Sequence, residues 1–127
     1  MKQPVDLARR FLALAERDMR AFRKLSDDPE MDDELVGFHA QQAVEKCLKA
    51  VLAKHQVEVR KTHDLNTLLA LLQENHLPTP PMIDEIKNLN PFAVMLRYDF
   101  MESEALDRAR ATSAVDAILA WAKAQIK

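Results

Sequence analysis

Glycine is almost absent from this chain: Gly37 is the only one among 127 residues. Loops that cradle phosphate groups need glycine where φ is positive or where the backbone closely approaches a ligand. Neither a P-loop nor a dinucleotide-binding fingerprint can therefore be written for this sequence, and we expect no bound cofactor. Two-residue hairpin turns also rely on glycine. The shortage argues against β-rich and Rossmann folds.

Cysteine is equally scarce, and the motifs of metal sites are missing. The single Cys47 excludes an internal disulfide and a multi-cysteine zinc site. It lies in an apolar helical stretch, which favours a small buried residue over a nucleophile. The chain has no His-Glu-x-x-His motif and no Glu-x-x-His pair, and its acidic run at 27–34 lacks the glycine and spacing of an EF-hand. We expect no metal site.

Long apolar runs are also lacking, since none approaches the roughly 18 residues that cross a bilayer. The N-terminus leads into charged, helix-like sequence rather than a signal-peptide core. These observations favour a cytoplasmic protein without membrane contact. The net charge of −2 argues against a general nucleic-acid or DNA coat. A local basic pocket remains compatible with that charge.

What the sequence does contain is helical periodicity. Its length, with 48% hydrophobic and 30% charged residues, predicts one domain over residues 1–127 with a single core. Five helices are expected, over Val5–Leu25, Pro29–His55, Thr62–Glu74, Met82–Leu89 and Ser103–Ile126. Long helices joined by short loops predict an all-α, up-and-down bundle of four to five helices.

Apolar residues three and four apart mark the buried side of each long helix. On the first two helices they are Ala8, Phe11, Leu12, Ala15, Met19, Phe22, Val36, Ala40, Ala43, Val44, Cys47, Leu48 and Val51. On the later helices they are Leu65, Leu68, Leu69, Leu71, Leu72, Val115, Ile118, Leu119, Ala122 and Ile126.

Local signals predict where two of these helices begin. Asp28 is a candidate N-cap with Pro29 in the first helical position, and Thr62 is a candidate N-cap of the third helix. Gly37 falls inside the second helix, where glycine costs roughly 1 kcal/mol relative to alanine. Close contact with a neighbouring helix would compensate for that cost.

A row of polar residues lies along the second predicted helix. Gln42, Glu45, Lys46 and Lys49 are spaced i, i+3, i+4 and i+7, so they project from one face. One interpretation is an ordinary solvated surface. The other is a polar groove, in which the two lysines offer charge to phosphate oxygens while Gln42 positions a ligand by hydrogen bonding.

Two histidines lie near the same elements. His63 is predicted at a helix start, directly after Arg60 and Lys61, where backbone N–H groups favour an anion. These three residues either hold a phosphate or simply cap the helix. His39 adjoins the core of the second helix and is interpreted as a hydrogen-bonded packing residue.

Arg97 lies between apolar residues, ahead of Tyr98 and Asp99. A charged side chain does not enter an apolar core without a partner. Arg97 therefore either pairs with an acid such as Asp99 or Glu45, or lines a pocket.

Three blocks of this sequence resemble the HEPN family (higher eukaryotes and prokaryotes nucleotide-binding domain). They are Phe38–Leu52, His63-Asp64-Leu65 and Arg97-Tyr98, in the family's order and spacing. The resemblance implies a bundle of four to five helices, commonly a homodimer, with a pocket formed by these blocks. It also implies a minimal nucleotidyltransferase partner, in a toxin–antitoxin or nucleotide-handling system.

Other HEPN members are metal-independent RNases, marked by an arginine, four to six intervening residues and a histidine. After Arg97 these spacings hold Glu102, Ser103 and Glu104. The usual general acid/base is thus missing, and the phenol of Tyr98 is a poor base at neutral pH. We therefore expect no RNase activity.

The preferred hypothesis is a nucleotide- or RNA-binding interaction module without catalytic residues. Its predicted ligand-binding residues are Gln42, Glu45, Lys46, Lys49, His63, Arg97 and Tyr98. One alternative is an RNase toxin with a rearranged site that uses His63 or His39. Another is a purely structural dimerisation module.

Overall fold

The computed structural model describes residues 3–59, 61–93 and 105–126. Arg97 and Tyr98, and with them the predicted Arg-Tyr part of the pocket, lie outside these ranges. The described chain is helical: α1 (Pro4–Ser26), α2 (Asp33–Lys54), α3 (Leu65–Glu74), α4 (Ile83–Leu89), the 3₁₀ helix η1 (Asn90–Ala93) and α5 (Arg108–Ile126). The predicted all-α bundle is confirmed.

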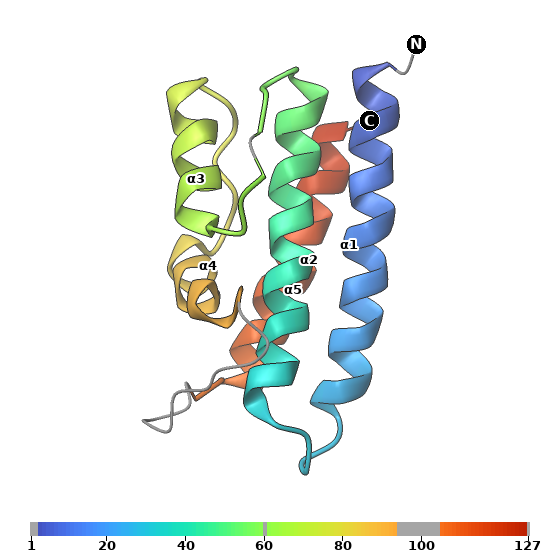
Figure 1. The fold of residues 1–127 in the computed structure, drawn as a ribbon, viewed down its shortest axis with the longest axis vertical. Helices are drawn as coiled ribbons and strands as arrows, with labels where there is room; N and C mark the ends of the chain where they lie inside the picture. Colours follow the sequence, from blue (N-terminus) through green and yellow to red (C-terminus); the bar gives the residue numbers. More distant parts are fainter. Residues whose placement is uncertain (1–2, 60, 94–104, 127) are drawn as a thin grey trace.

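Helix α2 is the centre of the fold. Figure 1 shows α1 antiparallel to α2 on one side, α5 behind, and α3 and α4 on the other side. The described residues 55–59 and 61–64 lie along α2 after its end, so that α3 begins beside the middle of the bundle. Helix α2 therefore has neighbours around most of its circumference, which explains why each of its residues is buried or partly buried.

The start of α2 corrects one prediction. The helix begins at Asp33 with Asp32 as N-cap, four residues later than the predicted start at Pro29. Asp28 instead forms a turn, in which its Oδ1 accepts a hydrogen bond from the backbone N–H of Glu30 at 2.9 Å. An aspartate before proline can locally be either an N-cap or a turn residue. The turn after α1 determined that Asp28 is a turn residue.

The start of α3 corrects a second prediction, which made Thr62 the N-cap. Its N-cap is Asp64, whose Oδ1 accepts from the N–H of Asn66 at 2.9 Å, whereas Thr62 Oγ1 accepts from the N–H of Asp64. His63 thus precedes the helix. The last helix begins at Arg108, and Asp107 Oδ1 accepts from a backbone N–H of its first turn. The predicted start at Ser103 lies outside the described residues.

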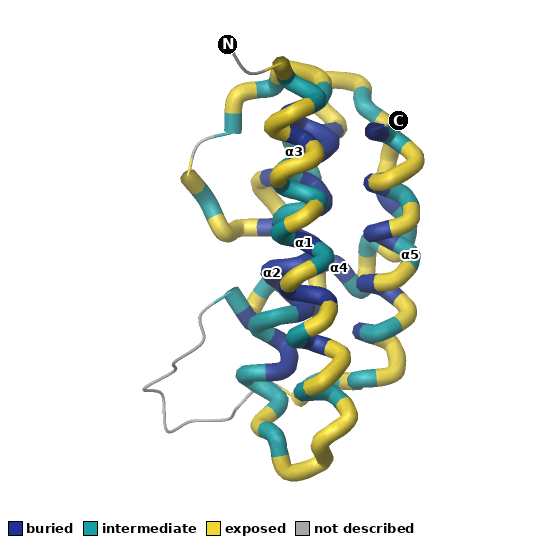
Figure 2. Tube along the Cα trace, turned by 90° about the vertical axis from the view of Figure 1, so that its right-hand side faces the viewer, coloured by how far each residue is buried: buried dark blue, intermediate teal, exposed yellow. Residues whose placement is uncertain are grey.

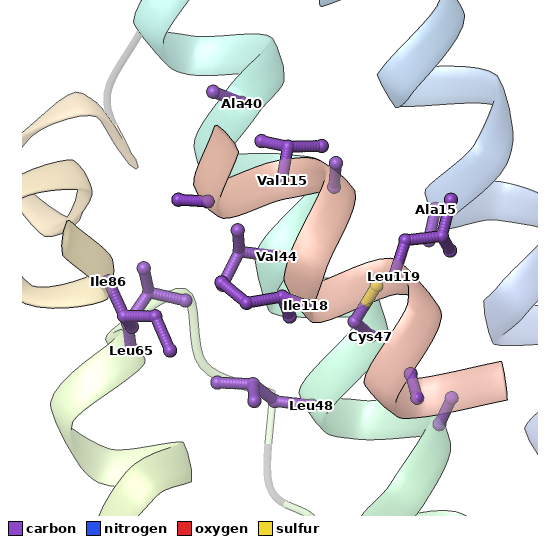
Figure 3. Packing of buried hydrophobic residues seen from close by; sticks show 14 of the residues in the cluster. Ala15, Ala40, Val44, Cys47, Leu48, Leu65, Ile86, Val115, Ile118 and Leu119 are labelled. Atoms are coloured by element: carbon purple, nitrogen blue, oxygen red, sulfur yellow. The ribbon is translucent and has the colours of Figure 1, made fainter. Parts of the chain in front are cut away.

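The predicted core is confirmed. Every predicted apolar position of α2 and α5 is buried, while Phe11, Leu12, Leu69 and Leu71 are partly buried at its edge. Figure 3 shows side chains of α2 and α5 meeting, with Leu65 and Ile86 closing the α3–α4 side. Along the tube in Figure 2, buried residues follow the inward side of each helix.

Gly37 confirms the expected close contact. A Cβ atom built there would lie 2.3 Å from the ring of Phe92, so η1 packs directly on the α2 backbone. None of the helices in the described ranges combines the length and apolarity needed to span a membrane.

Candidate functional site

The polar row of α2 lies largely beneath the surface. Glu45 is 2% exposed and Gln42 is 9% exposed, while Lys46 and Lys49 are partly buried. Interpreting the row as an ordinary solvated face is therefore wrong. It is covered because α1 lies along one side of it and the segment before α3 lies along the other.

Glu45 is the centre of the first half of the site. Its Oε1 lies 2.9 Å from Nδ1 of His63 and accepts from Gln41 Nε2 at 3.3 Å. Its Oε2 accepts from Lys49 Nζ at 3.1 Å. Gln41 Nε2 also donates to the backbone carbonyl of His63 at 2.9 Å, which fixes the segment against α2. The carboxylate is thus nearly fully hydrogen-bonded, as a buried charge requires.

Asp18 of α1 is the centre of the second half. This buried carboxylate pairs with Lys46, whose Nζ also lies 3.5 Å from Gln42 Oε1. Nδ1 of His39 lies 3.6 Å from Asp18 Oδ1, within reach of an ion pair, but this buried atom has no hydrogen-bond partner among the described residues. The prediction that His39 is hydrogen-bonded is wrong for this atom.

The side-chain amide of Gln42 joins the two halves. Gln42 Nε2 donates to Gln41 Oε1 at 2.7 Å, and a longer contact of 3.5 Å reaches Glu45 Oε1. The site is therefore a continuous buried network extending from α1, across α2, to the residues before α3.

The charges of this network largely cancel. Asp18 offsets Lys46, and Glu45 offsets Lys49. The predicted polar groove, in which the two lysines offer their charge to a phosphate, thus needs correction, because both lysines are ion-paired inside the protein. A carboxylate this well buried is tolerable only beside a cation, so the pairing also has a structural role.

The sequence and the fold of this chain are both similar to known proteins. The family model described as "HEPN domain" matches residues 8–125. The chain belongs to the HEPN family. The crystal structure of an archaeal HEPN homologue is similar over 100% of both chains, with a TM-score of 0.65 and 25% sequence identity. No curated protein matches the sequence.

Of the site residues predicted for this HEPN chain, the structure brings five together. The four residues of the polar row meet His63 through Glu45, as the sequence blocks implied. Lys61 is exposed, and Arg60 lies outside the described residues. The predicted convergence of Arg97 and Tyr98 on the row also concerns residues outside the described ranges and stays a prediction.

Sequence reasoning missed two members of the network, Asp18 and Gln41. The position of each residue relative to the apolar stripe of its helix indicated that it would be buried. Asp18 falls three residues after Ala15, within the apolar stripe of α1, and Gln41 aligns with Val44 and Leu48. A polar residue on a buried stripe needs a buried partner. That rule would have pointed to both.

His63 is the reactive group that this HEPN site offers to solvent, since its side chain is 63% exposed. The Glu45 carboxylate accepts a hydrogen bond, so it favours the tautomer with the proton on Nδ1. In the neutral imidazole Nε2 then lacks a proton and serves as an acceptor, whereas in the imidazolium form Nε2 is a donor as well. Among the described residues the imidazole makes no other polar contact, which leaves this nitrogen for a ligand.

Proposed function

We propose that this HEPN chain is a nucleotide- or RNA-binding interaction module, which works as a homodimer with a minimal nucleotidyltransferase in a toxin–antitoxin or nucleotide-handling system. The observation that carries the proposal is the meeting of exposed His63 with buried Glu45, beside the two lysines of α2. The partner and the dimer rest on the family resemblance.

Phosphate binding is the chemistry that these groups support. Each lysine ammonium has three donors. Lys49 gives one of them to Glu45, and Lys46 uses donors on Asp18 and Gln42. The remaining donors, together with a protonated His63, suit the oxygens of a phosphate. An anion must compete with the two internal carboxylates, which predicts modest affinity and strong dependence on salt.

Titration of the purified protein with ATP, GTP and a short single-stranded RNA tests this proposal. We expect saturable binding by calorimetry, weakened about tenfold by His63→Asn, which is the size of one lost charge-assisted hydrogen bond. His76→Asn is the matched control, because His76 is exposed after α3 and has φ 55°, a conformation that asparagine tolerates. Absence of saturable binding by the folded protein, or equal loss in both variants, overturns the proposal.

The partner requires its own experiment. If a nucleotidyltransferase is encoded beside this chain, co-expression and size-exclusion chromatography should give one co-eluting complex. Separate elution of the two proteins, each folded, would contradict that part of the proposal and leave ligand binding intact.

A second candidate function is metal-independent RNA cleavage, favoured specifically by the Glu45–His63 contact. In this candidate Nε2 of His63 takes the proton of a 2′-hydroxyl. The 2′-oxygen bonds to the adjacent phosphorus, the bond from phosphorus to the 5′-oxygen breaks, and that oxygen takes a proton from water. Cleavage of structured RNA in the presence of a chelator, leaving 2′,3′-cyclic phosphate ends and lost in His63→Asn, would support it. Intact RNA at several pH values removes it.

A further inference from the structure

An apolar groove adjoins the polar network. It has a volume of about 490 Å³ and lies between the first half of α1, the last turns of α2 and the segment that follows α2. In Figure 1 these parts meet at the end of the bundle where α1 begins. Its apolar lining consists mainly of Leu7, Phe11, Ala53, Val57 and Val59. This volume is within the range of roughly 300–1,000 Å³ typical of small-molecule sites.

Leu7 makes this groove unusual. Its side chain is 44% exposed, and only Met82 among the other large apolar residues of the described ranges is comparably exposed. A single exposed leucine needs no explanation. Here, however, it lines a concave surface that is mainly apolar, with Gln3, Lys49, Gln56 and Glu58 as its polar and charged members.

The groove is continuous with the proposed phosphate site through one residue. Lys49 lines the groove, and its Nζ donates to Glu45 Oε2 at 3.1 Å. Glu45 in turn contacts His63. A ligand lying in the groove would therefore have its body on apolar walls and one end at a cation, next to the exposed imidazole.

We propose that this groove binds the nucleobase and sugar of a nucleotide whose phosphates reach Lys49 and His63. The inference rests on the proposed function and assigns it a base-binding subsite. A nucleobase has apolar faces, which suit Leu7 and the ring of Phe11. Its edges carry hydrogen-bonding groups, and the exposed amide of Gln56 stands at the rim. A wholly apolar ligand would make no contact with the donors of Lys49 that remain beside its bond to Glu45.

The decisive experiment compares ATP with inorganic triphosphate, which has the charge but no base. The native protein should bind ATP more tightly than triphosphate. Leu7→Ser should weaken ATP binding about tenfold and leave triphosphate binding unchanged, because only apolar contact with the base is lost. Met82→Ser is the matched control, since it removes a comparably exposed apolar side chain (36%, against 44% for Leu7) outside the groove lining.

Each contrary result has a distinct meaning. Equal ATP affinity in the native protein and Leu7→Ser overturns the base subsite while the proposed function stands. Equal affinity of the native protein for ATP and triphosphate also overturns the base subsite and leaves the proposed function standing. If ATP binding is unchanged but Leu7→Ser dissociates a native dimer in sedimentation, a second copy occupies the groove and the inference is wrong. If the native protein binds neither ATP, GTP nor RNA, the proposed function and the subsite fail together.

Discussion

The Nδ1 atom of His63 lies 2.9 Å from Oε1 of Glu45, although 18 residues separate them in the chain. One residue is mostly exposed and the other is 2% exposed. The contact therefore connects solvent to the buried polar face of α2. A ligand that binds the imidazole would therefore also affect the hydrogen bonds that Glu45 makes beneath it.

Glu45 should contribute to stability chiefly by neutralising Lys49. Glu45→Gln keeps the shape but leaves a partly buried ammonium without its carboxylate, so we expect a loss of about 3 kcal/mol in the free energy of unfolding, measured with urea. The double variant Glu45→Gln/Lys49→Met should recover most of it. Lys123→Gln, which breaks the exposed pair with Glu16, is the control and should cost less than about 1 kcal/mol. Equal losses for both single variants would contradict the prediction.

Gly37→Ala should destabilise the protein even though alanine is the better helix former. The added methyl group would overlap the Phe92 ring, and such overpacking typically costs about 1–3 kcal/mol. Thermal unfolding in the background of Phe92→Leu, which removes the ring, should show a smaller loss from Gly37→Ala. An equal loss in the two backgrounds would mean that the ring is not the cause. Ser113→Ala, on the exposed side of α5, controls for helix propensity.

Arg108 should be needed to hold the turn between α1 and α2. Its guanidinium donates to the carbonyls of Ser26 and Asp28, at 3.0 and 2.8 Å, and to the Asp33 carboxylate at 3.1 Å. Arg108→Lys cannot reproduce this planar set, so we expect a loss of about 2 kcal/mol and faster hydrogen exchange in the turn. Arg110→Lys, at a 69% exposed side chain, should have little effect. Unchanged exchange in Arg108→Lys would rule this role out.

Because the thiol of Cys47 is buried, we expect the protein to lose stability at alkaline pH. Burial, with a smaller effect of Glu16, raises the pKa of its thiol from 9.0 to about 12. Between those values the unfolded chain releases a proton that the folded chain keeps, so stability is intact below pH 9.0 and falls as the pH rises, by up to about 1.4 kcal/mol per pH unit. Urea unfolding of Cys47→Ala should show a shallower decline over this range. An identical slope would show that the thiol does not cause it.

The core was predictable because helical spacing alone determines which residues share a face. Val44 and Leu48, for example, must point the same way wherever α2 packs. Helix starts were less predictable, because short polar residues near a turn offer several equivalent caps. Asp28 and Asp32 are chemically alike, and the turn that follows α1 made Asp32 the N-cap.

Spacing along α2 was enough to group Gln42, Glu45, Lys46 and Lys49, because four residues of one helix need no tertiary information to share a face. Whether that face is wet or buried, and which acids neutralise its lysines, depended on segments distant in the chain. Asp18 comes from α1 and His63 from the segment before α3, so packing alone brought them to α2. A buried charge takes its properties from its neighbours, and those neighbours are a consequence of the fold.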